Sequence, residues 1–571
     1  MPFDPATGAA SLADLLAMVE ADPGLKPSQR AQRAWALRTA AKYLGKPLEA
    51  LPARLTALRY GIGRLHPVQL GVKRKTFDNW RSAFAGAVRH YGGAMGLPRR
   101  GTRLAPEWQA LHDGLPDPHM RRGLVRLMRY CTAQGIGPSA VSDAVLVRFR
   151  AALEAETFST RINTVHRHNA VLWNRAVGTV PGWPNVRLSV PDYRPPRQGL
   201  SRDELPESFR QDVDAYLASK TLAPTPGAGI SALLDGPLAH PWAPRTAGLR
   251  REHIRLAASA AVHTGTPVEQ LQHLADLTEP QTAKRILGHY LARDAKELGR
   301  DEPKTFTIDL AYTLLSIARD WIRPSQADLE RLRQMSGNLE RYRRSGLTEK
   351  NLTVIRALMD PANKARLKAL PERLMEEAAK SHMPYRGAVT AQLAVAIAIL
   401  IVAPMRIGNL VRLRVDVELL RPGGAKAPYH IHFPKHMVKN QVDLEYPLPA
   451  HTTRLIDRYR TQFRPRLVNA ASDWLLPGEA GHKEERTLSG QLTKRVFAEI
   501  GIRITPHQFR HAAAAWLLQA DPGNFELVRR ILGHEDIATT VRFYIGLESI
   551  SAMRRYHGII TSDPGEEQRP Q

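Results

Sequence analysis

Cysteine is nearly absent from this 571-residue sequence, and acidic residues are scarce relative to basic ones. The single cysteine, Cys131, excludes an internal disulfide framework and indicates a reducing compartment. The 81 lysines and arginines outnumber the 55 aspartates and glutamates, which leaves a formal charge of +26. This excess indicates a polyanionic partner, because neutralised phosphates release counterions. A ribosomal or membrane-surface protein would share that charge.

Long hydrophobic runs are also missing. The most apolar segment, Ala388 to Ala403, has 16 residues, which is short for a bilayer span and predicts a buried core helix. The start Met1-Pro2-Phe3-Asp4 lacks the basic residues and apolar stretch of a secretory signal. Together with the single cysteine, these features predict a cytoplasmic protein that has no membrane partner.

Metal-binding patterns are absent as well. No cluster of cysteine and histidine has the spacing of a metal site, and His430 and His432 fall on the outer face of a predicted strand. The sequence therefore predicts no metal and no other cofactor. An apolar content of 43% nevertheless predicts several packed domains rather than a basic tail.

What the sequence does contain is a set of polar residues near its C-terminus. Thr505 and Pro506 predict a helix start, with threonine as N-cap and proline in the first turn. His507 and Arg510 then project from one face of that turn. Helix N-termini favour phosphate, because unpaired N–H groups and the helix dipole point outward there. An isolated pair of this kind is more often only a solvated helix edge.

The next segment strengthens the phosphate hypothesis. Leu527 to Leu532 predicts a short amphipathic helix that Gly533 terminates. His534 follows at once, and a further helix start leads to Tyr544. The segment Arg285 to His289 repeats the sequence of Arg530 to His534, but it lacks both the upstream histidine–arginine pair and the downstream tyrosine. We therefore interpret His289 as a coincidental match.

One more cationic side chain lies at the end of the predicted core helix. Arg406 follows the apolar segment directly, so it stands at the end of a buried element. Because an unpaired buried charge is very costly, Arg406 must meet an anion. The candidates are a carboxylate of the chain, such as Asp416, or a bound phosphate.

Two predicted strands flank a lysine. Residues 429–433 and 442–446 alternate apolar and polar side chains, which is typical of half-buried strands. Lys439 lies between them, at or near the tip of a hairpin. By itself a turn lysine is usually only solvated.

Taken together, these residues resemble the catalytic set of the tyrosine recombinase (phage integrase) family. The resemblance covers roughly residues 345–558, and six residue types occur in the family's order. The matching residues are Arg406, Lys439, His507, Arg510, His534 and Tyr544.

The resemblance implies a role for each residue. Tyr544 would attack the scissile phosphate, Arg406 and Arg510 would clamp its non-bridging oxygens, and the two histidines would assist proton movement. Lys439 would protonate the leaving 5′ oxygen. Arginine suits the clamp because its planar fork donates two bonds and stays charged. Religation of the phosphotyrosine would need neither ATP nor a metal.

Alternatives remain open at this point. Tyr556 is a second choice for the nucleophile, and Pro404-Met405 and Gly408-Asn409 replace residues that many family members carry around the first arginine. A type IB topoisomerase would use similar residues to relax DNA. The chain could also be a non-catalytic DNA-binding regulator that keeps the scaffold of a recombinase.

The expected fold class is mainly α and multidomain, with helical N-terminal domains before a mixed α/β catalytic domain that holds a small antiparallel sheet. We expect an N-terminal helical domain at 1–100, a possible DNA-binding arm, and a second at 101–195. A helical core-binding domain that clamps DNA is expected at 196–340, the catalytic domain at 341–560 and a disordered tail at 561–571.

The resemblance also implies partners. These are double-stranded DNA recombination sites, four copies of the chain assembled on them, and possible accessory proteins that bend DNA or set direction.

Overall fold

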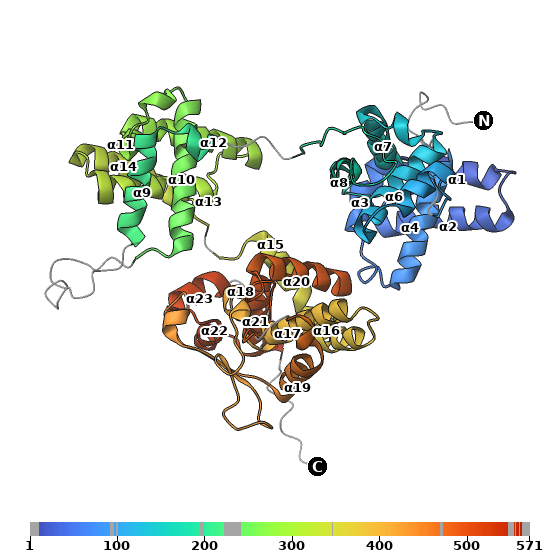
Figure 1. The fold of residues 1–571 in the computed structure, drawn as a ribbon. Coiled ribbons are helices and arrows are strands. Elements are labelled where there is room, and N and C mark those ends of the chain that lie inside the picture. The colour runs from blue at the N-terminus through green and yellow to red at the C-terminus, as the bar shows by residue number, and fades with distance from the viewer. Residues whose placement is uncertain are drawn as a thin grey trace, which may run out of the picture. The chain divides into compact units, whose positions relative to one another are not determined.

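The computed structural model describes residues 11–91, 96–98, 101–193, 199–221, 241–344, 346–468, 472–545, 553, 556–558 and 560–561. Within these residues the protein is mainly helical and has one small antiparallel sheet, as the sequence predicts. The expected tail lies outside the described residues apart from Thr561. The chain divides into two compact units, residues 193–345 and the remainder (Figure 1).

Two successive helical bundles open the chain. The first has α1 (Leu12–Ala21), α2 (Pro27–Leu44), α3 (Leu55–Arg64) and α4 (Arg74–Tyr91). The second has α5 (Pro106–Asp113), α6 (Pro118–Ala133), α7 (Asp143–Glu156) and α8 (Ile162–Ala176). Each bundle buries tryptophan in an apolar core of its own, Trp80 in the first and both Trp108 and Trp173 in the second.

Residues 193–345 form the separate unit around a third apolar core. Its helices are α9 (Glu207–Thr221), α10 (Pro244–His263), α11 (Leu274–Thr278), α12 (Pro280–Leu298), α13 (Thr305–Ile317) and α14 (Gln326–Glu340). The three N-terminal cores fall inside the three N-terminal domains that the sequence predicts. The exact domain boundaries stay predictions.

The C-terminal region combines helices with the sheet. Its helices are α15 (Glu349–Met359), α16 (Pro361–Ala379), α17 (Pro384–Val402), α18 (Ile407–Val411), α19 (Ala450–Arg458), α20 (Glu485–Ile500), α21 (Pro506–Ala520), α22 (Phe525–Leu532) and α23 (Ile537–Tyr544). The strands are β1 (Leu419–Leu420), β2 (His430–Phe433) and β3 (Leu444–Pro447).

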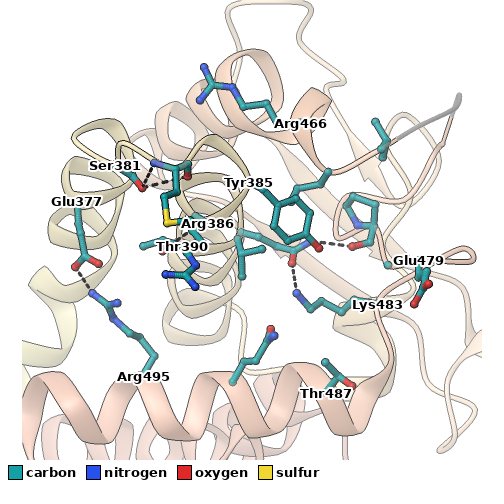
Figure 2. Close-up of a pocket in the computed structure, with 18 of the residues that line it drawn as sticks. Glu377, Ser381, Tyr385, Arg386, Thr390, Arg466, Glu479, Lys483, Thr487 and Arg495 are labelled. Atoms are coloured by element: carbon teal, nitrogen blue, oxygen red, sulfur yellow. Dashed lines mark hydrogen bonds and ion pairs between the residues drawn. The ribbon is translucent and has the colours of Figure 1, made fainter. Parts of the chain in front are cut away.

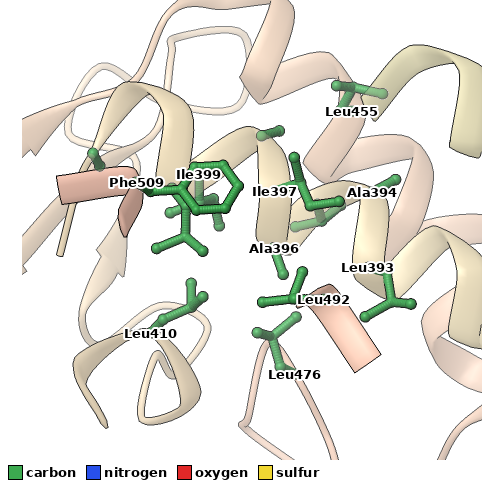
Figure 3. Close-up of a cluster of buried hydrophobic side chains, with 14 of the residues drawn as sticks. Leu393, Ala394, Ala396, Ile397, Ile399, Leu410, Leu455, Leu476, Leu492 and Phe509 are labelled. Atoms are coloured by element: carbon green, nitrogen blue, oxygen red, sulfur yellow. The ribbon is translucent and has the colours of Figure 1, made fainter. Parts of the chain in front are cut away.

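Helix α17 is the centre of the C-terminal core. Ile397 and Ile399 are fully buried among side chains from other elements, including Leu492 of α20 and Phe509 of α21 (Figure 3). By length and composition α17 is one helix of the described chain that could cross a membrane. Its burial among these elements identifies it instead as the predicted core helix. At about 25 cal/mol per Å² of buried apolar surface, such packing is the main source of stability.

The sheet is a small antiparallel ribbon in the order β1-β2-β3. In its longer pair Ile431 lies opposite Tyr446 and Phe433 opposite Leu444, and all four side chains are buried. The outward positions include His430 and His432. The sequence prediction of alternating strands on both sides of Lys439 is therefore confirmed, and the sheet covers one side of the residues described next.

Candidate functional site

Arg510 lies at the centre of a cluster of polar side chains and is only 3% exposed. It comes from α21, and its Nη1 donates to Pro404 O at 2.6 Å while its Nη2 donates to Leu532 O at 2.6 Å. These bonds tie the end of α17 to the end of α22. Burial and the neighbouring Arg406 lower the pKa of Arg510 to about 10. At neutral pH the guanidinium keeps its charge.

Arg406 is the N-cap residue of α18 and is half-buried. Its Nη1 is buried and has no hydrogen-bond partner in the part of the chain that the structure describes. Burial lowers the pKa of Arg406, which records the cost of its unpaired charge. Asp416 is not its partner, since that carboxylate lies 3.8 Å from Arg460 Nη2. The pair of arginines therefore has free capacity for an external anion.

His507 stands on the first turn of α21, where the sequence places it. Thr505 is the N-cap, and its N–H donates to Gln508 Oε1 at 2.8 Å in a capping box. His507 reaches solvent, yet partial burial and the charges of Arg510 and Arg406 lower its pKa. An imidazole that stays neutral beside two guanidinium groups is available to accept a proton.

His534 follows the left-handed residue Gly533, which ends α22 with φ of 57°. The Gly533 carbonyl accepts a bond from Asn440 Nδ2 at 2.9 Å, so the turn after β2 holds the end of α22. His534 Nδ1 lies 2.9 Å from Thr540 Oγ1. Burial and the charges of Arg510 and Arg406 lower the pKa of His534 to about 4.

Tyr544 ends α23 and is only 2% exposed. Its ring packs with Leu518, Val528 and other apolar side chains, parallel to the His534 ring at 6.5 Å. Its hydroxyl lies 2.8 Å from Nδ1 of His511. Burial raises the pKa of Tyr544 to about 12, and the charge of Arg510 opposes that rise. The phenol thus lies beside the cations and is protonated at neutral pH.

Lys439 is placed differently. It is exposed in the turn before β3, and among the described residues no hydrogen bond or ion pair joins it to the rest of the cluster. Its neighbour Asn440 is anchored to Gly533 O. Five of the six predicted residues are therefore gathered by α18, α21, α22 and α23, and the lysine stands on a neighbouring turn.

Sequence reasoning missed residues that support the cluster. His511 contacts the phenol, and Tyr446 donates its hydroxyl to Ile531 O at 2.9 Å. A signal for His511 was present, because it lies four residues after His507 on the same helix face. No comparable signal marks Asn351 of α15, which reaches His511 across the fold.

A large cavity of the C-terminal region is separate from this cluster. It has a volume of about 2340 Å³ and is lined by none of the six predicted residues. Lys483 donates a hydrogen bond to the side chain of Gln392. Figure 2 shows Glu377 paired with Arg495. Its lining mixes both signs of charge, which gives it no preference for an anion.

A smaller cleft of about 1400 Å³ lies between the two N-terminal bundles. No carboxylate pairs with any of its five arginines among the described residues, and its own acids are engaged elsewhere: Asp78 lies 3.4 Å from Arg74 Nε, and Glu156 accepts from Leu97 N. Burial and the nearby Arg89 lower the pKa of Arg126. The five are Arg33, Arg81, Arg89, Arg126 and Arg129.

The C-terminal region is therefore a mainly helical domain that brings two arginines, three histidines and a tyrosine close together, with one buried guanidinium nitrogen left unpaired among the described residues. Residues 370–549 match the phage integrase family. The match is confined to this C-terminal region of the chain.

The curated relatives are recombinases. XerD, a tyrosine recombinase of Pseudomonas aeruginosa, is 30% identical over 139 residues, which are 24% of this chain and 43% of XerD. A protein of Sinorhizobium fredii, y4qK, provisionally named an integrase/recombinase, is 31% identical over 108 residues, 18% of this chain and 33% of y4qK. The chain thus spans less than half the length of either relative.

Solved structures show partial likeness. The Tn1549 transposon integrase in complex with transposon right end DNA has a TM-score of 0.34 and 17% identity, and the match covers 62% of this chain and 100% of that one. XerH bound to its difH substrate has a TM-score of 0.30 and 15% identity, covering 64% and 100%.

Proposed function

We propose that this chain is a site-specific DNA recombinase that cleaves and rejoins DNA strands through a 3′-phosphotyrosine at Tyr544. The observation that carries this proposal is the gathering of a tyrosine hydroxyl and two guanidinium groups, of which Arg406 retains an unpaired buried Nη1. A phosphodiester supplies the missing anion and is also the group that a phenol attacks.

The proposed cleavage step exchanges one phosphate ester for another. A bond forms between Tyr544 Oη and phosphorus while the bond to the 5′ oxygen breaks. The phenol proton passes to a neutral imidazole, His507 or His534, and the leaving 5′ oxygen takes a proton from Lys439. The guanidinium groups stabilise the charge that spreads over the equatorial oxygens. The chemistry needs neither metal nor ATP.

Two parts must move for this step. Tyr544 is 2% exposed, so DNA must displace part of its cover before the hydroxyl can reach phosphorus. Lys439 is exposed on the turn between the strands and must fold over the bound phosphate. We propose that DNA binding brings both into place.

The N-terminal bundles would supply further DNA contacts. The five arginines of the cleft between them lack carboxylate partners among the described residues, and two of their nitrogens, Arg33 Nη1 and Arg129 Nε, are buried without a hydrogen bond. Phosphate oxygens would satisfy both the charge and these donors. The unit at 193–345 would be the core-binding clamp, and four copies of the chain would assemble on two sites in the cytoplasm. Accessory proteins would bend the DNA or set the direction of the reaction.

The decisive experiment traps the covalent intermediate. Full-length protein is incubated with a nicked suicide duplex that carries its recombination site, taken from the DNA flanking its gene. We expect a protein–DNA adduct that resists denaturation and is lost in Tyr544→Phe but kept in Tyr556→Phe. Tyr556 is the matched control, because it is exposed and contacts only His557 among the ring contacts of the described residues.

The other outcomes are equally informative. No adduct with any variant would refute the proposal and favour a DNA-binding regulator. Relaxation of a supercoiled plasmid that lacks the site, without recombinant product, would indicate a type IB topoisomerase. Loss of the adduct in Tyr556→Phe alone would move the nucleophile to Tyr556.

A further inference from the structure

The hydroxyl of Tyr544 is the last member of a hydrogen-bonded chain that starts at a backbone amide. The chain runs from Thr505 N through the side chains of Gln508, Asn351 and His511. Its members come from α15, α21 and α23, so the tertiary fold assembles it. Each link constrains which atom of the next side chain donates.

The first links fix the orientation of two amides. A backbone N–H can only donate, so the Gln508 atom 2.8 Å from Thr505 N must be the oxygen Oε1. The nitrogen of that amide then points the other way and donates to Asn351 Oδ1 at 3.2 Å. With its oxygen used in this bond, Asn351 presents Nδ2, a group with hydrogens and no acceptor capacity, to its next neighbour.

That neighbour is Nε2 of His511, at 3.4 Å. Facing an amide donor, Nε2 must act as the acceptor. Burial, then the nearby His507 and the charges around it, lower the pKa of His511 to about 3, so the ring is neutral at pH 7. A neutral imidazole has a single hydrogen, and it must reside on the other nitrogen, Nδ1. Nδ1 lies 2.8 Å from Tyr544 Oη.

We propose that His511 is a positioning residue that donates its Nδ1–H to the oxygen of Tyr544, and that the Thr505–Gln508–Asn351 relay holds it in that tautomer. The inference rests on the proposed function of Tyr544 as nucleophile. In this arrangement His511 does not accept the phenol proton. It holds the oxygen and leaves the phenol hydrogen free to point at another acceptor.

The hydrogen bond that His511 Nδ1–H donates to Tyr544 Oη becomes stronger during the reaction. A hydrogen bond to a charged oxygen is stronger than one to a neutral hydroxyl, so Nδ1–H stabilises the phenolate character that develops as the proton leaves. His511 is 4% exposed, and water cannot readily replace it. The relay therefore links a helix cap at residue 505 to the reactivity of a side chain at residue 544.

The tautomer is measured directly by NMR on the full chain labelled with ¹⁵N in the histidine rings. The signals of His511, one of 21 histidines, are identified by their loss in His511→Phe. We expect Nδ1 to carry the hydrogen and Nε2 to be unprotonated at pH 7. An Nε2–H tautomer or a doubly protonated ring would overturn the proposal.

A second experiment replaces the donor that faces His511 Nε2 with an acceptor. In Asn351→Asp the neighbour becomes an acceptor, so Nε2 takes up a hydrogen and its ¹⁵N signal changes to the protonated form. Asn363→Asp on α16 makes the same change outside the relay and should leave His511 unaltered. An unchanged His511 spectrum in Asn351→Asp would show that the relay does not set the tautomer.

The third arm measures the effect on the nucleophile. In single-turnover assays on the suicide duplex, we expect His511→Phe to slow adduct formation about tenfold or more, the scale of one bond to a developing charge. His511→Asn, whose Nδ2 can replace Nδ1–H, should recover part of the rate. Equal rates for both variants would refute the positioning role. The NMR arms need no cleavage, so failure of the proposed function alone leaves the tautomer result standing.

Discussion

The two arginines of the C-terminal cluster have different roles because their surroundings differ. Arg510 donates two hydrogen bonds to the main-chain carbonyls of Pro404 and Leu532. It therefore holds the segments around the cluster together and also contributes positive charge to it. Arg406 has a buried Nη1 without a partner among the described residues, so it remains free for a ligand. A residue type alone does not reveal which of these tasks an arginine performs.

The structural task of Arg510 leads to a stability prediction. In Arg510→Lys a single ammonium cannot span both carbonyls, so one bond from a charged donor is lost. We expect the C-terminal region to lose about 1.5–3 kcal/mol of unfolding free energy, the usual value of such a bond. Urea unfolding followed by tryptophan fluorescence measures it. Arg503→Lys, at an exposed position three residues before the same helix, should change little. Equal midpoints for the two variants would contradict this assignment.

Burial of His511 predicts a dependence on pH. Its pKa is about 3 in the folded protein and near 6.5 when unfolded, so the unfolded state binds more protons between these values. Stability is therefore full above pH 6.5 and falls as the pH drops below it. Between pH 7 and 5 we expect this residue to account for about 2 kcal/mol.

The measurement compares urea midpoints at the two pH values in the parent and in His511→Gln. The variant should lose part of the pH dependence, whereas His436→Gln, at an exposed position, should keep it all. Identical pH profiles for the parent and His511→Gln would show that His511 is not buried in neutral form.

At the scale of elements, two segments of identical sequence adopt different structures. Arg530 to His534 ends α22, and its Gly533 is left-handed, with φ of 57°. Arg285 to His289 continues through the interior of α12. In α12 His289 contacts the ring of His263, whereas His534 faces the arginines. The sequence prediction that only the second copy belongs to the site agrees with this difference.

The two glycines should therefore respond with opposite signs to the same substitution. A Cβ on Gly533 would lie 2.3 Å from Leu444 Cδ2 and would require a left-handed alanine. We expect Gly533→Ala to cost about 2 kcal/mol or more. A Cβ on Gly288 meets nothing within 4 Å, so Gly288→Ala should stabilise its helix by about 0.5–1 kcal/mol.

Differential scanning calorimetry of the full chain measures both variants. A Leu444→Ala background isolates the steric part, because it removes the clash but keeps the backbone strain. Gly533→Ala should cost less there than in the parent. Equal costs in the two backgrounds would show that contact with Leu444 is unimportant, and stabilisation by Gly533→Ala would contradict the left-handed conformation.

At the scale of the whole molecule, the net charge of +26 is spread over regions with different uses. Many surface arginines pair with neighbouring acids, as Arg529 does with Glu526. The arginines of the N-terminal cleft do not pair with carboxylates among the described residues. Charge that lacks an internal partner is the part available to a polyanion.

This distinction predicts a salt effect on DNA binding. The slope of log affinity against log salt concentration is negative, and its magnitude decreases by about 0.9 for each phosphate contact that is lost. The double variant Arg89→Gln/Arg126→Gln should therefore lower this magnitude by about 1–2, measured by fluorescence anisotropy with labelled duplex. Arg103→Gln/Arg122→Gln removes the same charge from exposed positions outside the cleft and should have a smaller effect. Equal slopes for the two variants would exclude the cleft as a DNA contact.

The sequence by itself determined the local features. Thr505 and Pro506 begin α21, Gly533 ends α22, and the apolar segment before Arg406 is buried, each as predicted. Caps, left-handed glycines and apolar periodicity depend on residues within about one helical turn, so they are legible in a short window of sequence.

Only the tertiary structure decided how the polar side chains are paired. It joined Tyr544 to His511, bound Arg510 to two carbonyls, gave Asp416 to Arg460 rather than Arg406, and left Lys439 on an exposed turn. Asn351 and His511 are 160 positions apart, and their contact exists because α15 packs against α21. Such contacts depend on the positions of whole helices and strands. Buried apolar packing fixes those positions, and the spacing of polar residues does not.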